Sequence, residues 1–363
     1  MAFPEAPFRS GEALLVFVAL VSSTAAAALV VEPADHRTNF FAGGEAALGT
    51  VIRGGDAVEG TLVWVLAVGG RTLATGALEV RHAAGGATRR SVTVALPQGR
   101  AGVVIEAEFT AALVDAAGLR LGACSRPVRI FPTDPFADRT RWLAALGIIV
   151  IDPRGETEKT LTAAGVPFES FRADADVAAL EVRLIIVGEG TSWREHPRLP
   201  HALAGAAARG ARVLCLAPRD GTMPLPGTDD AADLFATSLL LRRADVVADL
   251  DARLDCRDWS DAAEPTVGGL ALTAEGDAVV VRATAGSAGW PWLEAGFARR
   301  AATPAAGKLL ICTLGIVAHW DETPAARFLF AAILERLDAG KPDAGLHHPA
   351  SPIRPQPLQE HDR

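Results

Sequence analysis

Polar side chains that could do acid–base chemistry follow several short apolar runs in the later part of the chain. Asp152, Glu189, Ser192 and Asp220 each come just after such a run, and His319 follows the last one. Carboxylates and imidazoles are common general acids and bases. If the runs are parallel strands, their carboxyl ends share the sheet edge where ligands bind. We therefore take Asp152, Glu189 and His319 as candidate catalytic residues, and Ser192 and Asp220 as candidate ligand-binding residues.

The residues around His319 also allow a purely structural interpretation. Asp321 and Glu322 come just before Pro324, and an acidic residue ahead of a helix that begins with proline commonly caps its first turn. We therefore expect Asp321 or Glu322 to cap a final helix, with His319 satisfied by the backbone.

Aromatic side chains suggest a recognition site in the same part of the chain. Five tryptophans fall in expected loops or segment ends: Trp193, Trp259, Trp290, Trp292 and Trp320. Indole faces at such positions could stack on sugar rings, although packing in a core or an interface is their commoner use. Trp290, Trp292 and Trp320 are our candidate ligand-binding residues among them.

The cysteines and acidic residues predict neither a metal site nor a cofactor. The four cysteines are widely separated and form no CxxC pair, so neither a zinc site nor a disulfide scaffold is indicated. Cys215 and Cys312 lie inside apolar runs and are expected to be buried thiols. The aspartates of residues 245–261 lack the spacing of a calcium-binding loop and indicate a solvated surface.

The net charge and the N-terminal segment bear on whether the protein binds nucleic acid and whether it is exported. The net charge of −8 argues against nucleic-acid binding, which depends on clustered Lys and Arg. Residues 14–21 are strongly apolar and a run of small residues follows, which is typical of an export signal. We expect an exported protein located in the periplasm, outside the cell or in the envelope. An uncleaved N-terminal segment would be its only membrane contact.

Turn and strand patterns predict two domains. Residues 1–28 are the signal or hydrophobic segment. Residues 29–132 contain about seven strand-like segments separated by glycine-rich turns, a pattern typical of an immunoglobulin-like sandwich. Residues 133–139 contain the linker, and residues 339–363, rich in proline, are expected to form a disordered tail.

The second domain, residues 140–338, is predicted to be α/β. Continuous apolar runs indicate buried strands at residues 146–151, 184–187, 212–217 and 309–314, with a shorter strand at 168–171. Helical stretches lie between or after them at residues 156–164, 200–209 and 324–337. Such alternation predicts a three-layer α/β domain with a mostly parallel sheet. Residues 219–306 are less regular, with strands predicted only at 239–241 and 278–283.

The order of these parts resembles a known family. The segments that carry the likeness are residues 146–152, 184–189, 210–214, 307–312 and 324–327. They are similar to the flavodoxin-like, class I glutamine-amidotransferase-like domain that follows a β-sandwich in bacterial proteins associated with glycoside hydrolases. The resemblance covers residues 140–337 and implies a carbohydrate-related context.

The catalytic residues that the resemblance would imply are missing. Active members use a cysteine in a Gly-x-Cys-x-Gly elbow together with a late His-x-Glu pair. Here Cys124 has Arg126 in place of the second glycine, Cys215 lies inside a strand, and His319 and Glu322 are three positions apart. We therefore expect a non-catalytic binding or assembly protein whose partner is a carbohydrate or another envelope protein. The alternative is a hydrolase that uses the cleft at the strand ends. The sequence does not indicate an oligomeric state.

Overall fold

The computed structural model describes residues 28–172, 177, 184–226, 233–243, 245–255, 270–274, 277–281, 290–300 and 307–339. Nearly all of the expected signal segment and of the expected tail, together with Trp259 and Cys256, lies outside the described residues. None of the helices in the described part of the chain is long and apolar enough to cross a membrane.

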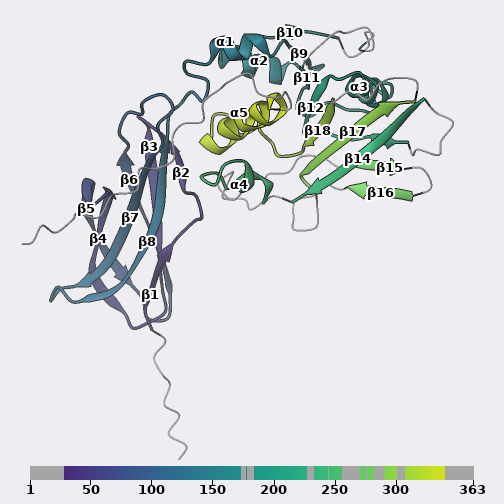
Figure 1. Cartoon of the computed structure of the whole chain (residues 1–363). Coiled ribbons are helices and arrows are strands. Elements are labelled where there is room, and N and C mark those ends of the chain that lie inside the picture. Colours follow the sequence, from purple (N-terminus) through teal and green to yellow (C-terminus); the bar gives the residue numbers. More distant parts are fainter. Residues whose placement is uncertain are drawn as a thin grey trace, which may run out of the picture.

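The first part of the chain forms two sheets packed as a sandwich (Figure 1). One sheet has the order β1-β3-β6 and consists of β1 (Val30–Pro33), β3 (Glu45–Arg53) and β6 (Ala87–Ala95). The other has the order β2-β8-β7-β4-β5 and consists of β2 (Asn39–Phe41), β8 (Arg120–Phe131), β7 (Ile105–Asp115), β4 (Val58–Val68) and β5 (Arg71–His82).

Alternating side chains build the core of this sandwich. On β4, Leu62 and Leu66 are buried whereas Val63 between them is exposed, as the two-residue period of a strand requires. Trp64 packs against Phe109 with ring centroids 6.3 Å apart. Gly76 on the neighbouring strand leaves room for the indole, because a Cβ there would lie 2.6 Å from it. Trp64 was predicted to fill the core; it is partly buried and packs against the core of the sandwich.

The second part is organised around a seven-stranded sheet of order β10-β9-β11-β12-β18-β17-β14. Its strands are β9 (Ile148–Ile151), β10 (Glu169–Ser170), β11 (Leu184–Val187), β12 (Arg212–Leu216), β14 (Leu234–Arg242), β17 (Trp292–Arg299) and β18 (Lys308–Cys312). Strands β10, β9, β11, β12 and β18 pair in parallel, whereas β17 and β14 are antiparallel to their neighbours.

Further elements flank this sheet. A separate three-stranded sheet has the order β13-β15-β16 and consists of β13 (Thr222–Leu225), β15 (Leu270–Ala274) and β16 (Asp277–Val281). The helices are α1 (Thr140–Ala145), α2 (Glu156–Ala163), α3 (Leu199–Ala208), α4 (Val246–Leu250) and α5 (Pro324–Asp338). Residues of α5 share one apolar core with alternate residues of the central strands, and residues of α3 share the other.

The predicted fold class is wrong. We expected an immunoglobulin-like sandwich followed by a three-layer α/β domain with a mostly parallel sheet. The described residues as a whole are instead 46% strand and 17% helix, arranged in several mixed sheets, and a three-layer α/β domain is not evident. The difference arises within residues 219–306, which contribute β13 to β17. Antiparallel strands can leave one face in water. β14, with four consecutive exposed residues, is an example. Of β13 to β17, the sequence predicted only parts of β14 and β16, at residues 239–241 and 278–283.

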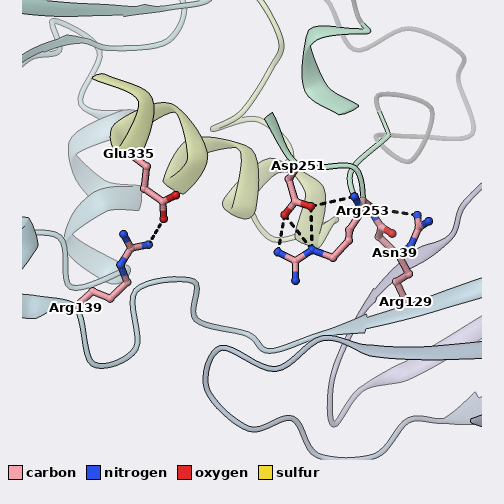
Figure 2. Close-up of polar contacts among 6 residues, drawn as sticks. All are labelled: Asn39, Arg129, Arg139, Asp251, Arg253 and Glu335. Atoms are coloured by element: carbon pink, nitrogen blue, oxygen red, sulfur yellow. Dashed lines mark hydrogen bonds and ion pairs between the residues drawn. The ribbon is translucent and has the colours of Figure 1, made fainter. Parts of the chain in front are cut away.

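The two parts of the chain meet at a junction between the sandwich and the elements α4 and α5 (Figure 1). The backbone carbonyl of Arg253, just after α4, accepts hydrogen bonds from Asn39 Nδ2 at 3.2 Å and from Arg129 NH1 at 3.1 Å (Figure 2). The Arg253 guanidinium in turn donates hydrogen bonds to both carboxylate oxygens of Asp251. Phe131 packs against Phe328 of α5 with centroids 4.8 Å apart. Polar and aromatic contacts thus hold the sandwich against the elements α4 and α5.

Removing the Asp251 carboxylate tests the junction. Asp251→Ala leaves the Arg253 guanidinium without its partner, so we expect the free energy of unfolding to fall by about 1–3 kcal/mol. Urea denaturation measures the change. The matched control is Glu59→Ala, which breaks the exposed pair between Glu59 and Arg81 and should cost less than about 1 kcal/mol. Equal losses from the two variants would contradict a special role for Asp251.

Candidate functional site

The candidate site lies at the carboxyl edge of the parallel strands. Strands β9, β11, β12 and β18 run in the same direction, so the loops that follow them gather at one edge. These loops carry the residues that the sequence singled out, namely Asp152, Glu189, Ser192, Asp220 and His319. The structure brings Glu189 and the loop that carries His319 into contact, and it joins Ser192 to Asp220.

Asp152 is held by the first turn of α2. Its carboxylate accepts hydrogen bonds from the amides of Thr157 at 2.7 Å and Glu158 at 3.1 Å. It also accepts one from the Arg154 amide at 3.2 Å. Gly188 is required beside it, because a Cβ there would lie 2.5 Å from Asp152 Oδ1. Asp152 thus satisfies the free amides of a helix end.

Glu189 is a largely buried carboxylate that binds the loop before α5. Its oxygens accept hydrogen bonds from the amides of Val317 at 2.7 Å and Ala318 at 3.1 Å. Its own amide donates to Thr157 Oγ1 at 2.9 Å. Burial raises the pKa of Glu189 above its usual range, although these amides and the nearby His319 and Arg154 oppose the shift.

His319 and Glu322 form a pair within this loop. His319 Nδ1 lies 2.7 Å from Glu322 Oε2, and the side chains are 24% and 63% exposed. The prediction that Asp321 or Glu322 caps the final helix is wrong: Thr323 is the cap of α5, and its hydroxyl accepts a bond from the Ala325 amide. Asp321 pairs with Arg327 instead. The imidazole therefore has a carboxylate partner and remains partly open to solvent.

Ser192 and Asp220 link the loops after β11 and β12. Ser192 Oγ donates to Asp220 Oδ1 at 2.7 Å, and the two residues form an isolated parallel bridge. Desolvation opposes ionisation of Asp220, but the bonds from Ser192 Oγ and the Arg194 amide, with the nearby Arg219, outweigh it and lower the pKa. Asp220 is therefore a stable anion that organises the edge.

The tryptophans predicted to bind a ligand differ in exposure. Trp292 is fully buried and donates to Glu294, and Trp320 is 6% exposed against Phe330. Only Trp290 of the three is half-buried, with the Arg243 guanidinium 5.1 Å from its ring centroid. In this conformation Trp290 is the one member of the set that presents part of its indole to solvent.

The thiols at the centre of the sheet are inaccessible. Cys215 and Cys312 are both 0% exposed. Burial raises the pKa of Cys312 to about 12 and that of Cys215 still further. A buried, protonated thiol is a poor nucleophile. Among the described residues no group of His, Cys, Asp and Glu is placed to hold a metal ion.

Three features of the edge were not identified from the sequence. Ala217, just after β12, has φ of 32°, which an L-residue rarely adopts and which marks local strain. Thr313 Oγ1, just after β18, is buried without a hydrogen-bond partner. Arg154 lies beside Gly190, whose Cβ, if present, would be 2.7 Å from the guanidinium. Thr313 and Ala217 both lie near the ends of runs that the sequence marks as buried strands, at residues 309–314 and 212–217, so neither residue is singled out by the sequence.

Comparisons with known proteins give only remote likenesses. No family model matches the chain, and no curated protein matches it. It is similar to the sporulation control protein Spo0M from Bacillus subtilis, with 14% identity over 32% of this chain and 55% of that one, at a TM-score of 0.24. It is also similar to a β-glucuronidase from glycoside hydrolase family 2, with 13% identity over 53% of this chain and 20% of that one, at 0.22.

A third similar structure is a putative β-galactosidase from Bacteroides fragilis, with 8% identity over 53% of this chain and 39% of that one, at a TM-score of 0.22. Distant structural neighbours of the chain thus include carbohydrate-active enzymes. The matched parts span about half or less of these three proteins. At such scores the likenesses carry no functional argument.

The raised pKa of Glu189 makes stability depend on pH in a defined direction. The folded chain holds this proton more tightly than the unfolded chain. Its contribution to stability is therefore complete below the ordinary value of 4.5 and is lost as pH rises through the raised pKa. We expect wild type to lose stability relative to Glu189→Gln as pH is raised from about 4. Urea titrations at several pH values measure this, and a constant difference between the two proteins would contradict it.

The burial of the central thiols can be tested by alkylation. In the native protein at pH 8 we expect Cys215 and Cys312 to resist iodoacetamide, because the thiolate is the reactive form. Both should react after unfolding in guanidinium, as mass spectrometry can measure. The half-buried Cys124 is an internal comparison and should react faster than either. Rapid native labelling of Cys215 or Cys312 would mean that a nucleophile is accessible.

Proposed function

We propose that the chain is a non-catalytic binding or assembly protein of the cell envelope or exterior, with a carbohydrate-containing partner. The observation that supports a non-catalytic role is that the carboxylates at the edge already accept hydrogen bonds within the protein. Asp152 and Glu189 accept hydrogen bonds from backbone amides, and Asp220 accepts hydrogen bonds from the Ser192 hydroxyl and a backbone amide. A general base must instead be free to take a proton from a substrate.

The buried thiols support the same proposal. Nucleophilic catalysis by cysteine needs an accessible thiolate, which a positive environment or a nearby imidazole usually stabilises. Cys215 and Cys312 have neither accessibility nor a lowered pKa. Export is supported by the apolar segment at residues 14–21 and the small residues that follow it.

A second candidate function, hydrolysis, is favoured by one observation. The His319–Glu322 pair at 2.7 Å has the geometry of a base oriented by a carboxylate, and Glu189 with its raised pKa lies close enough to interact with His319. In this mechanism His319 would remove a proton from water, while protonated Glu189 would donate one to the leaving group. The water attacks as hydroxide, and the leaving group departs protonated.

A polysaccharide screen with two readouts separates these functions. We expect saturable binding to at least one neutral glycan without release of reducing sugar. We also expect Trp290→Ala to weaken binding by about threefold to tenfold, because its indole is partly exposed and stacking contributes about 0.5–1.5 kcal/mol. Trp292→Ala is unsuitable as a binding variant because that ring is fully buried.

The hydrolase alternative gives a different result in the same assay. It requires release of reducing sugar that is lost in both His319→Ala and Glu322→Gln. The matched control is Glu195→Gln, which changes an exposed carboxylate paired with Arg219. If none of the glycans binds and none is cleaved, the carbohydrate part of the proposal is wrong.

A further inference from the structure

The outer face of the five-stranded sandwich sheet is hollowed at one end. A cavity of about 400 Å³ lies there, with walls from β4, β7, β8 and the turn that joins β4 to β5. This volume is within the range of pockets that bind small molecules. The cavity belongs to the sandwich, so it is a different site from the sheet edge in the second part of the chain.

The strand register places charged side chains around this cavity. On β7, Glu106 and Glu108 are exposed whereas Ala107 between them is buried, so both carboxylates lie on the outer face of the sheet. Glu106 is opposite Arg129 of β8, and Glu108 is opposite Ala67 of β4. Opposite residues of antiparallel strands have Cβ atoms about 4.5–5.5 Å apart. Two carboxylates and one guanidinium therefore line the same hollow.

Small residues keep the hollow open. Ala67 places only a methyl group beside Glu108. Gly69 and Gly70, which form the turn at the rim, have φ of 54° and 82°, values that glycine adopts without the steric penalty of a side chain. A Cβ at either glycine would have no neighbour within 4 Å beyond the adjacent residues of the chain. The turn thus borders open space.

The two carboxylates are free to bind a ligand. Neither Glu106 nor Glu108 makes a hydrogen bond or an ion pair with the residues that the structure describes. Arg129 is positioned by the bond from its NH1 to the Arg253 carbonyl at 3.1 Å (Figure 2), and its remaining N–H groups can serve a bound molecule. The Arg253 guanidinium interacts electrostatically with Glu106 but is already bound to Asp251.

The balance of charge favours a cationic ligand. Two carboxylates against one guanidinium give the lining a net negative charge, which repels an anion. No group of three His, Cys, Asp or Glu residues in the described chain is placed to hold a metal ion, so an organic ammonium group is the better match. Hydroxyl groups on the same ligand can accept from the Arg129 guanidinium and donate to a carboxylate.

We propose that the cavity binds a cationic amino sugar, with its ammonium group between Glu106 and Glu108 and a hydroxyl group at Arg129. A free amino acid also carries an ammonium group, but a carboxylate placed at Arg129 would lie beside Glu106 and be repelled. The inference goes beyond the proposed function, because the cavity is separate from the sheet edge and from Trp290.

Isothermal titration calorimetry at low ionic strength and about pH 6, where glutamates are ionised, tests the cavity. Glucosamine is the cationic probe, and N-acetylglucosamine is its neutral counterpart, with an amide in place of the ammonium group. We expect glucosamine to bind at least about tenfold more tightly. Added salt should weaken its binding, because salt screens exposed charges.

Variants locate the binding. We expect the double variant Glu106→Gln, Glu108→Gln to lose the preference for glucosamine. The matched control is Glu79→Gln, since Glu79 is an exposed glutamate on β5 of the same sheet and does not line the cavity, so this variant should bind as wild type. Thermal unfolding of each variant verifies that it is folded.

Each other outcome overturns a defined part of the proposal. Equal affinity for the two sugars would overturn the ammonium contact. A preference for glucosamine that persists in the double variant would overturn the location. Binding of free lysine in preference to glucosamine would overturn the sugar class. If neither sugar binds, this inference is wrong, whereas the polysaccharide screen with Trp290→Ala still decides the proposed function separately.

Discussion

The hydrogen bonds that the partly buried carboxylate of Glu189 accepts from the loop before α5 are the interaction on which the edge of the sheet depends. A carboxylate removed from water is costly unless its oxygens are hydrogen-bonded. The amides of Val317 and Ala318 supply those bonds at 2.7 and 3.1 Å. The same bonds fix the loop after β18, which would otherwise have to satisfy its amides elsewhere. The direction in which the chain enters α5 follows from this contact.

This loop also connects the edge to the sandwich. The carbonyl of Glu322 accepts a hydrogen bond from Arg37, which belongs to the sandwich part of the chain. Arg327, in the first turns of α5, donates to the carbonyls of Trp320 at 2.6 Å and Thr133 at 2.8 Å, and its guanidinium lies 4.6 Å from the Phe41 ring centroid. One continuous set of contacts thus joins Glu189, the loop, α5 and the junction. The position of His319 is fixed by the fold of the whole second part.

The sequence predicted the buried elements better than the exposed ones. The runs that became β9, β11, β12 and β18 are apolar because both faces of these strands are covered, and such runs are visible without a structure. β14 and β17 were less visible in the sequence. Only residues 239–241 of β14 were predicted as a strand, and the polar or small residues Glu294 and Gly296 interrupt the apolar residues of β17 although most of that strand is buried.

The candidate site was predictable in its position but not in its contacts. Residues that follow apolar runs were expected at one edge, and Glu189, His319, Ser192 and Asp220 lie in its loops. The cap of α5 was missed because an acidic residue and a threonine are equally acceptable caps by type, and only the geometry favours Thr323. Trp292 lies at a segment end, as expected, but it begins the buried strand β17 and its ring is fully buried.

The distinction between binding and catalysis at this edge depends on which polar groups remain unused. Three carboxylates are tied to backbone amides or a hydroxyl, whereas the donors of Arg154 are open. Of the groups described at this edge, His319 and the exposed Glu322 also remain partly open to solvent. The strained Ala217 and the unpaired Thr313 hydroxyl come directly after the neighbouring strands β12 and β18, whose last residues pair in parallel. Strain persists only where the surroundings hold it, so we expect the backbone at Ala217 to be held firmly by its neighbours.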